Sequence, residues 1–341
     1  MATAAPFPPL SVSMAFVRGM LGGVRAKGLC VQPFLAAAGI DDSLLEQASA
    51  RVTGEQYVTL FRAITHRLND DGLGFFSRQL RTGSLALMVR SGMGAENLQV
   101  CLRRFGRTFA LLQDDVHLTM RREGKLACLQ LHFSTTDTRY PDFMHELLLR
   151  IFWRLMAWLV GGKLPARRFD LAFDCPPYAG SYRNVLPGEL CFQQLNSGVW
   201  FDADYLTYPV RRDEVAFRAF MQDALTNIIL PRRKDDEVAA RVRECLQQSM
   251  PIWLDLSAAA HAMHMSVSTL HRNLSQERTN FQTLKDELRR DIAISRLITT
   301  NVPLGALATE LGFSDSAAFQ RAFKCWTGSP PGEYRRSFER E

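Results

Sequence analysis

The spacing of apolar residues divides the chain into a mixed first part and a helical last part. Apolar residues recur at helical spacing in four early runs, at 57–68, 96–113, 141–160 and 213–229. Between these runs, apolar and polar residues alternate as they do in strands, at 116–120, 129–133, 169–173, 190–192 and 199–201. The first part is therefore expected to have an α+β fold.

Local signals place some of the boundaries. Thr53 followed three residues later by Gln56 is a capping box, which predicts the start of the first helix. Gly124 separates the first two strands and predicts a hairpin. Pro231 ends the helical run before it, and charges of both signs follow as far as Asp236, so we place the domain boundary at this point.

From residue 237 onward every apolar run has helical spacing, which predicts an all-α domain. Within this domain the pattern that begins at Ala260 returns about 48 positions later, at Ala308. Each copy has a short helix, a turn and a second helix, so the domain is expected to contain two helix-turn-helix units. A long helix at 281–299 would join the units and hold their separation.

The second helix of each unit carries a polar outer face. In the first unit, Ser266 is a good helix cap, and three residues share the face opposite the apolar one: Ser268, His271 and Arg272. In the second unit the outward residues are Ser316, Ala317, Gln320 and Arg321, followed by Lys324. Arginine can bind guanine through two hydrogen bonds and glutamine can bind adenine in the same way, whereas alanine offers only apolar contact with a thymine methyl group. The two helices are thus expected to enter successive major grooves of one DNA duplex.

Net charge does not by itself locate a DNA-binding surface. The 341-residue chain has a formal charge of +6, but residues 232–341 hold 16 Lys and Arg against 14 Asp and Glu, which leaves +2. Its 47% hydrophobic content suffices for packed cores in two or three domains. The sequence predicts neither a signal peptide nor a membrane span. Seven scattered cysteines with no C-x-x-C pair are typical of reduced thiols, so a cytoplasmic location is expected.

The helical domain resembles the AraC/XylS family of transcriptional regulators. The resemblance covers residues 255–336 and rests on three motifs: Leu311-Gly-Phe-Ser-Asp-Ser316, Phe319-x-Arg321-Ala-Phe-Lys324 and Trp326-Thr-Gly328-Ser-Pro330. It implies that the second helix of each unit reads bases. Residues 31–211 are more weakly similar to the arabinose-binding domain class of these regulators, which implies effector sensing and dimerisation but not arabinose itself.

With the resemblance included, four segments are expected: an N-terminal extension at 1–30, an effector-sensing and dimerisation domain at 31–211, a linker helix and hinge at 212–236, and a tandem helix-turn-helix domain at 237–341. The expected function is that of a sequence-specific DNA-binding regulator, an activator rather than a repressor, controlled by an unidentified small-molecule effector. The expected partners are a double-stranded DNA operator, a second copy of the chain and, for an activator, RNA polymerase. No cofactor, metal or membrane partner is expected.

Two alternatives stay open at this point. The first domain could be controlled by a protein partner instead of a small molecule. The chain could also be a cysteine-dependent enzyme fused to a DNA-binding domain, with Cys191 as the nucleophile; its position inside a predicted strand favours buried packing instead. Three histidines, His261, His264 and His271, lack a nearby cysteine or carboxylate that would complete a tetrahedral metal site.

The two predicted turns differ at one position. His264 stands in the first turn where the second turn has Gly312. If the turns share one geometry, both residues adopt a left-handed backbone with positive φ, which costs glycine least because it has no Cβ atom.

Overall fold

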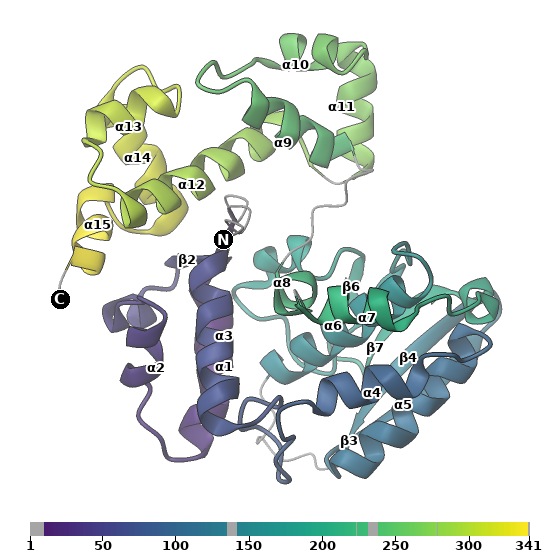
Figure 1. Cartoon of the computed structure of the whole chain (residues 1–341). Coiled ribbons are helices and arrows are strands. Elements are labelled where there is room, and N and C mark those ends of the chain that lie inside the picture. The colour runs from purple at the N-terminus through teal and green to yellow at the C-terminus, as the bar shows by residue number, and fades with distance from the viewer. Residues whose placement is uncertain (1–9, 135–141, 223, 231–237, 278, 340–341) are drawn as a thin grey trace. The chain divides into compact units, whose positions relative to one another are not determined.

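The computed structural model describes residues 10–134, 142–222, 224–230, 238–277 and 279–339. The chain forms two compact units. Residues 15–34 and 58–232 make up one of them, called the sheet unit below. Residues 1–14, 35–57 and 233–341 make up the other, called the helical unit. The elements of both are labelled in Figure 1.

The sheet unit is built on a five-stranded sheet with the order β3-β4-β7-β5-β6. Its strands are β3 (Val116–Glu123), β4 (Leu126–Phe133), β5 (Arg168–Asp170), β6 (Glu189–Cys191) and β7 (Ser197–Asp202). β3 and β4 form the predicted hairpin around Gly124, and β5 and β6 pair in parallel while the other neighbours pair antiparallel. β7 lies in the middle of the sheet and is buried from Ser197 to Phe201. The expected α+β fold is confirmed.

Helices pack against this sheet and against one another. Within the described residues, the sheet unit contains all or part of eight helices: α1 (Met14–Ala26), α2 (Gln32–Ala37), α3 (Gly54–Leu68), α4 (Ser84–Gly92), α5 (Leu98–Leu112), α6 (Asp142–Leu159), α7 (Glu214–Gln222) and α8 (Ala224–Ile229). Phe109 of α5 meets Phe152 of α6 edge to face, with the ring centres 5.6 Å apart. Such aromatic pairs add to the stability that burial of the rings provides.

Several predicted boundaries are confirmed and others need correction. The Thr53 amide donates to Gln56 Oε1 at 3.0 Å and the Gln56 amide donates to Thr53 Oγ1 at 3.1 Å, so the capping box forms and α3 begins at Gly54. The strand predicted at 169–173 is shorter, because it ends at Asp170. The single helix predicted at 213–229 is described as α7 and α8; Asp223 between them lies outside the described residues, as does the predicted hinge at 231–236.

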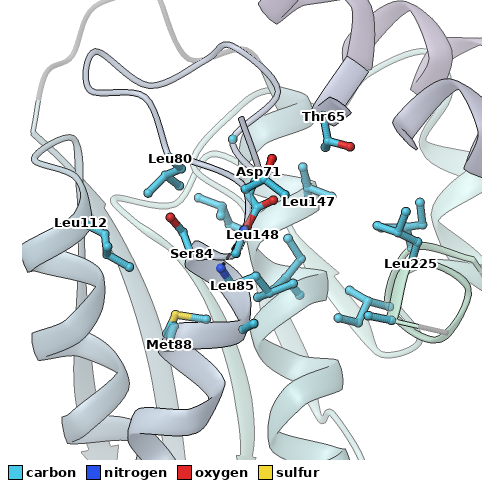
Figure 2. A pocket seen from close by; sticks show the side chains of 18 of the residues that line it. Thr65, Asp71, Leu80, Ser84, Leu85, Met88, Leu112, Leu147, Leu148 and Leu225 are labelled. Carbon is cyan, nitrogen blue, oxygen red and sulfur yellow. Dashed lines mark hydrogen bonds between the residues drawn. The ribbon is translucent and has the colours of Figure 1, made fainter. Parts of the chain in front are cut away.

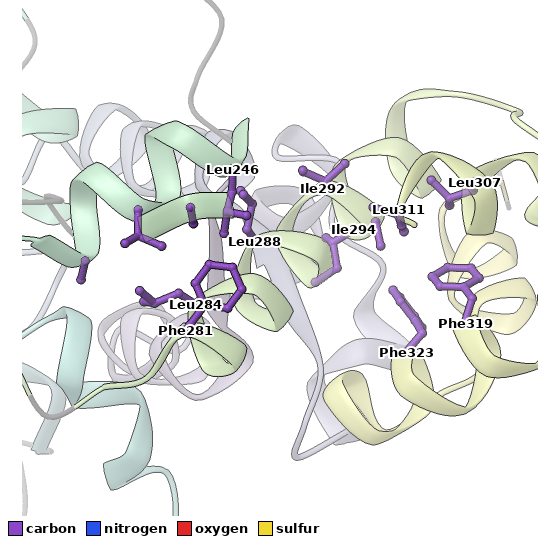
Figure 3. Close-up of a cluster of buried hydrophobic side chains, with 14 of the residues drawn as sticks. Leu246, Phe281, Leu284, Leu288, Ile292, Ile294, Leu307, Leu311, Phe319 and Phe323 are labelled. Carbon is purple, nitrogen blue, oxygen red and sulfur yellow. The ribbon is translucent and has the colours of Figure 1, made fainter. Parts of the chain in front are cut away.

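The helical unit has one continuous apolar core. Its helices are α9 (Val238–Gln248), α10 (Leu256–Ala262), α11 (Val267–Gln276), α12 (Phe281–Thr299), α13 (Leu304–Glu310), α14 (Ser316–Thr327) and α15 (Pro331–Glu339). α12 is the long helix predicted at 281–299. It contributes Leu284, Leu288 and Ile294 to a core to which both helix-turn-helix units also contribute (Figure 3). The two units of the repeat therefore share one core instead of folding as separate modules.

A short ribbon from the start of the chain belongs to the helical unit. β1 (Ser11–Ser13) pairs antiparallel with β2 (Arg51–Thr53), and β2 contacts α12. Ser11 Oγ donates to the buried carboxylate of Asp291 on α12 at 2.5 Å, and Arg51 Nε donates to Ser11 Oγ at 2.7 Å. The hydroxyl of Tyr334 on α15 donates to the carbonyl oxygen of Arg51. Asp291 thus has hydrogen-bonding partners although it is buried, as a buried carboxylate requires.

Within the part of the chain that the structure describes, none of the helices combines the length and the apolar character that a membrane crossing needs.

Candidate DNA-binding surface and effector pocket

The first helix-turn-helix consists of α10 and α11. Asp255 caps α10 by accepting a hydrogen bond from the Ala258 amide at 2.8 Å. Ser266 caps α11 as predicted, since its hydroxyl accepts from the Thr269 amide at 3.1 Å. Leu270 is buried on the inner side of α11. Side-chain caps of this kind satisfy amides that have no partner within the helix, and so fix where each helix starts.

The two turns have the geometry that the repeat predicts. His264 has φ +56° and Gly312 has φ +70°, so both adopt the left-handed backbone. A Cβ atom at Gly312 would lie 2.5 Å from Cδ1 of Trp253, which is closer than real Cβ contacts come. Glycine is therefore needed in the second turn for two reasons, backbone conformation and space.

The structure places the expected base-reading residues of α11 on one outer face. Ser268, His271 and Arg272 are all exposed. Ser268 lies within hydrogen-bond distance of the Ser266 hydroxyl, at 3.0 Å, which holds it at the start of the helix. Among the described residues, no ion pair engages Arg272.

The corresponding face of α14 is more cationic. Ala317, Gln320, Arg321 and Lys324 are exposed, while Ser316 is half-buried at the first position of the helix. Gln320 Nε2 donates to Ser316 Oγ at 3.3 Å. The cap of this helix is Asp315, and its pKa is lowered chiefly by the hydrogen bond from the Ala318 amide, with a smaller contribution from the charge of Arg321.

A polar brace connects the start of the first unit to the turn of the second. Trp253 Nε1 donates to the carbonyl oxygen of Glu310 at 2.9 Å. The guanidinium carbon of Arg289 on α12 lies 4.9 Å from the ring centre of Trp253 and 4.8 Å from that of Phe313. Arg289 also donates to the carbonyl oxygen of Gly312 at 3.1 Å. Cation–π contacts and hydrogen bonds together join the segment before α10 to α12 and to the turn between α13 and α14.

Sequence reasoning missed Trp253 and Arg289. Neither lies inside the repeated pattern, and their partnership joins three segments that are far apart along the chain. The only trace in the sequence is the glycine at position 312, where the first turn has His264, because glycine permits a close approach to the backbone.

The sheet unit contains a pocket of about 330 Å³ (Figure 2). Side chains from α3, α4, α5, α6, α7 and α8 and from the loop between α3 and α4 line it, and most of them are apolar, including Phe61, Leu80, Leu85, Met88, Phe109, Leu112, Leu147, Leu148, Ile151, Leu225 and Ile228. Its volume falls in the range of pockets that bind small molecules, about 300–1,000 Å³. An apolar interior of this size can hold one small ligand.

Asp71 is the charged residue of the pocket. Its Oδ2 accepts hydrogen bonds from the amides of Gly83 and Leu85, both at 3.1 Å, at the start of α4. Burial raises the pKa of this carboxyl, and the backbone hydrogen bonds oppose that effect. Thr65, a further polar residue of the lining, donates to carbonyl oxygens of its own helix.

The sequence pattern did not locate this pocket. The predicted helix at 141–160, which is α6, provides Met144, Leu147, Leu148, Ile151 and Phe152 of the lining. The other walls come from residues 61–112 and 221–229. Both α4 and the role of Asp71 were missed, because the contact between Asp71 and the start of α4 depends on the loop between them.

Cys191 has the surroundings of a structural thiol. It ends β6, as the strand prediction implied, but it is half-buried instead of fully buried. Burial is the main cause that raises the pKa of its thiol, whereas a cysteine nucleophile needs a lowered pKa. In the described residues, no group of three or more histidines, cysteines or carboxylates is arranged to hold a metal ion.

Comparison with known proteins agrees with this architecture. Residues 28–210 match the family model of the arabinose-binding domain of AraC transcription regulators, and residues 259–337 match that of a helix-turn-helix domain. The chain belongs to the AraC family. It is a transcriptional regulator with a DNA-binding helix-turn-helix region and an N-terminal ligand-binding domain, and its relatives are regulators, not enzymes.

Relatives match nearly the whole chain at low identity. The ornithine utilization regulator of Pseudomonas aeruginosa is 25% identical over 325 residues, which cover 95% of this chain and 96% of that protein. The HTH-type transcriptional regulator VirS of Mycobacterium tuberculosis is 23% identical over 316 residues, 92% of each chain. The crystal structure of the transcriptional regulator CdpR from Pseudomonas aeruginosa covers 96% of this chain and 99% of its own, with a TM-score of 0.34 and 16% identity.

Proposed function

We propose that this regulator binds a specific operator through α11 and α14 and that a small molecule in the pocket of the sheet unit controls it. The observation that carries the DNA-binding half is the pair of exposed polar faces on two capped helices that share one core. Arg272 and Arg321 are the proposed base readers of the two grooves, with Ser268, His271 and Gln320 beside them. Ser316 and Ala317 complete the face of α14, and Lys324 is the proposed phosphate contact.

The observation that carries the effector half is the position of α8 in the chain. α8 lines the pocket through Leu225, Ile228 and Ile229, and it is the last described element before the segment that leads to α9. Arg150 Nε of α6 donates to the carbonyl oxygen of Ile228 at 2.9 Å, so α8 is fastened to the pocket wall at its C-terminal end. A ligand that shifts α8 would shift the point at which the chain leaves the sheet unit for the helical unit. Ligand occupancy and operator binding are thereby coupled.

As for the other partners, we propose a homodimer that activates transcription through contact with RNA polymerase, in the cytoplasm where a bacterial operator lies. A single chain would bind the operator on its own, and dimerisation would increase the affinity through avidity. Sedimentation velocity of the full chain with and without operator tests the dimer. Transcription in vitro with purified RNA polymerase separates activation from repression.

Selection of bound sites from genomic DNA supplies the operator and the neighbouring genes, from which effectors can be chosen for testing. Two adjacent residues of α5 then provide a matched test of the pocket. Leu112 lines the pocket, whereas Leu111 is 74% exposed. Leu112→Trp should abolish the change in operator affinity that the effector causes, because the indole fills the cavity, and Leu111→Trp should leave it intact. An unchanged effector response in Leu112→Trp would exclude this pocket and favour control by a protein partner.

A further inference from the structure

The lining of the pocket restricts the chemistry of its ligand. Apolar side chains from six helices form most of the wall, and few polar groups interrupt it. A sugar buried here would leave most of its hydroxyl groups without hydrogen-bond partners, at a cost of about 1–3 kcal/mol for each such group. The pocket therefore disfavours arabinose and other polyhydroxylated molecules, whatever the family model is called.

Charge restricts the ligand further. Of the described residues that line the pocket, Asp71 alone has an ionisable side chain, and no lysine, arginine or histidine is among them. A ligand carboxylate would find no positively charged partner in this lining and would face the charge of Asp71. Burying an unpaired charge is costly, and burying it beside a like charge costs more.

Asp71 can instead pair with a donor. A carboxylate has about four acceptor sites in all, and two of those on Asp71 receive the amides of Gly83 and Leu85. The start of α4 holds the carboxyl group in place through these two bonds. Asp71 therefore meets a ligand as a positioned acceptor.

We propose that the effector is a small, mainly apolar molecule with a single amine as its head group, and that the ammonium binds at Asp71 while the apolar part fills the space between α4, α5 and α6. This inference rests on the proposed function, since it assumes that the pocket is the effector site. It assigns Asp71 as the residue that selects the head group. An ammonium–carboxylate hydrogen bond is stronger than a neutral one, so an amine binds better than an alcohol of the same chain.

Three probes with eight carbon atoms and different head groups test the proposal: n-octylamine, 1-octanol and sodium octanoate. Their binding to the full chain is measured by isothermal titration calorimetry at pH 7. We expect octylamine to bind about tenfold more tightly than octanol and octanoate to bind weakest. Octanoate binding as tightly as octylamine would overturn the choice of head group, while leaving the pocket as an effector site.

Substitutions test the choice of head group and the role of the pocket separately. Asp71→Asn should weaken octylamine about tenfold and leave octanol within about threefold of its original affinity, because only the ion pair is lost. Equal weakening of both ligands would assign Asp71 a structural role and overturn the proposal.

Leu112→Trp should remove binding of all three probes, with Leu111→Trp as the control that retains it. If no probe binds the native chain, or if Leu112→Trp leaves binding unchanged, the pocket itself fails as the effector site. If Asp71→Asn does not fold, the ranking of the three probes on the native chain still decides the head group.

Discussion

The turns of the two helix-turn-helix units share one backbone conformation but differ in the contacts that surround them. Their turn residues, His264 and Gly312, share a left-handed conformation. The side chain of His264 is exposed, whereas Gly312 lies against Trp253 and its carbonyl oxygen accepts a hydrogen bond from the guanidinium of Arg289. The comparison shows that the turn alone tolerates a side chain. Glycine becomes necessary only where the surroundings press against the backbone.

The outer faces of the units differ as well. α11 offers one arginine, Arg272, together with His271 and Ser268, whereas α14 offers Arg321 and Lys324 together with Gln320. The unit whose turn contacts Trp253 and Arg289 thus carries the more cationic face. Since phosphate contacts and bidentate base contacts both need accurate placement, we expect α14 to contribute more to operator affinity than α11.

The largest expected effect comes from Gly312→Ala. A left-handed alanine costs about 1–2 kcal/mol, and an added methyl group that overlaps a packed neighbour costs typically about 1–3 kcal/mol. The free energy of unfolding of the helical unit, followed by circular dichroism in urea, should fall by roughly 2–5 kcal/mol. Gly305→Ala in α13 is the matched control, because its Cβ atom meets open space and its φ is not positive. That variant should be stable or slightly more stable; an equal loss in both would refute the packing argument.

Removal of the brace should have the next largest effect. Arg289→Ala deletes two cation–π contacts and one hydrogen bond, which together contribute about 1–3 kcal/mol. Arg289→Lys keeps the charge but loses the planar group that lies between two aromatic rings, so it should recover only part of the loss. Urea unfolding and fluorescence anisotropy on the operator measure stability and binding separately. Full recovery by lysine would show that charge alone matters at this position.

Substitutions of the proposed base-reading residues should have the third largest effect. Arg321→Ala should cost about 1–3 kcal/mol of operator affinity and relax preference at one base pair, whereas Lys324→Ala should weaken cognate and scrambled DNA alike. Arg272→Ala on α11 should lose less than Arg321→Ala, in line with the difference between the two units. Anisotropy titrations on both DNAs at fixed salt provide the comparison, because phosphate contacts make the affinity salt-dependent. If Arg321→Ala loses equally on scrambled DNA, Arg321 contacts phosphate instead of a base.

Local chemistry explains which features could be predicted. The helix at 281–299, the Ser266 cap and the left-handed turns depend on residues within one or two helical turns of each other, so the sequence pattern determines them. The Asp291 carboxylate is different, since its partner Ser11 is 280 positions away along the chain. The same holds for the pocket, where Asp71 acquires its role only once α4 has been placed beside it. Features that depend on distant contacts leave little trace in apolar spacing.

The smallest expected effect is that of His264→Gly. Glycine relieves the left-handed strain of a residue with a Cβ atom, but it also increases the conformational entropy of the unfolded chain. The two contributions oppose each other, so the change in free energy of unfolding should lie between zero and about 1 kcal/mol of stabilisation. Operator affinity should stay the same, because the turn keeps its shape. A loss of stability greater than about 1 kcal/mol would mean that the imidazole makes a stabilising contact, and the first turn would then depend on its surroundings as the second one does.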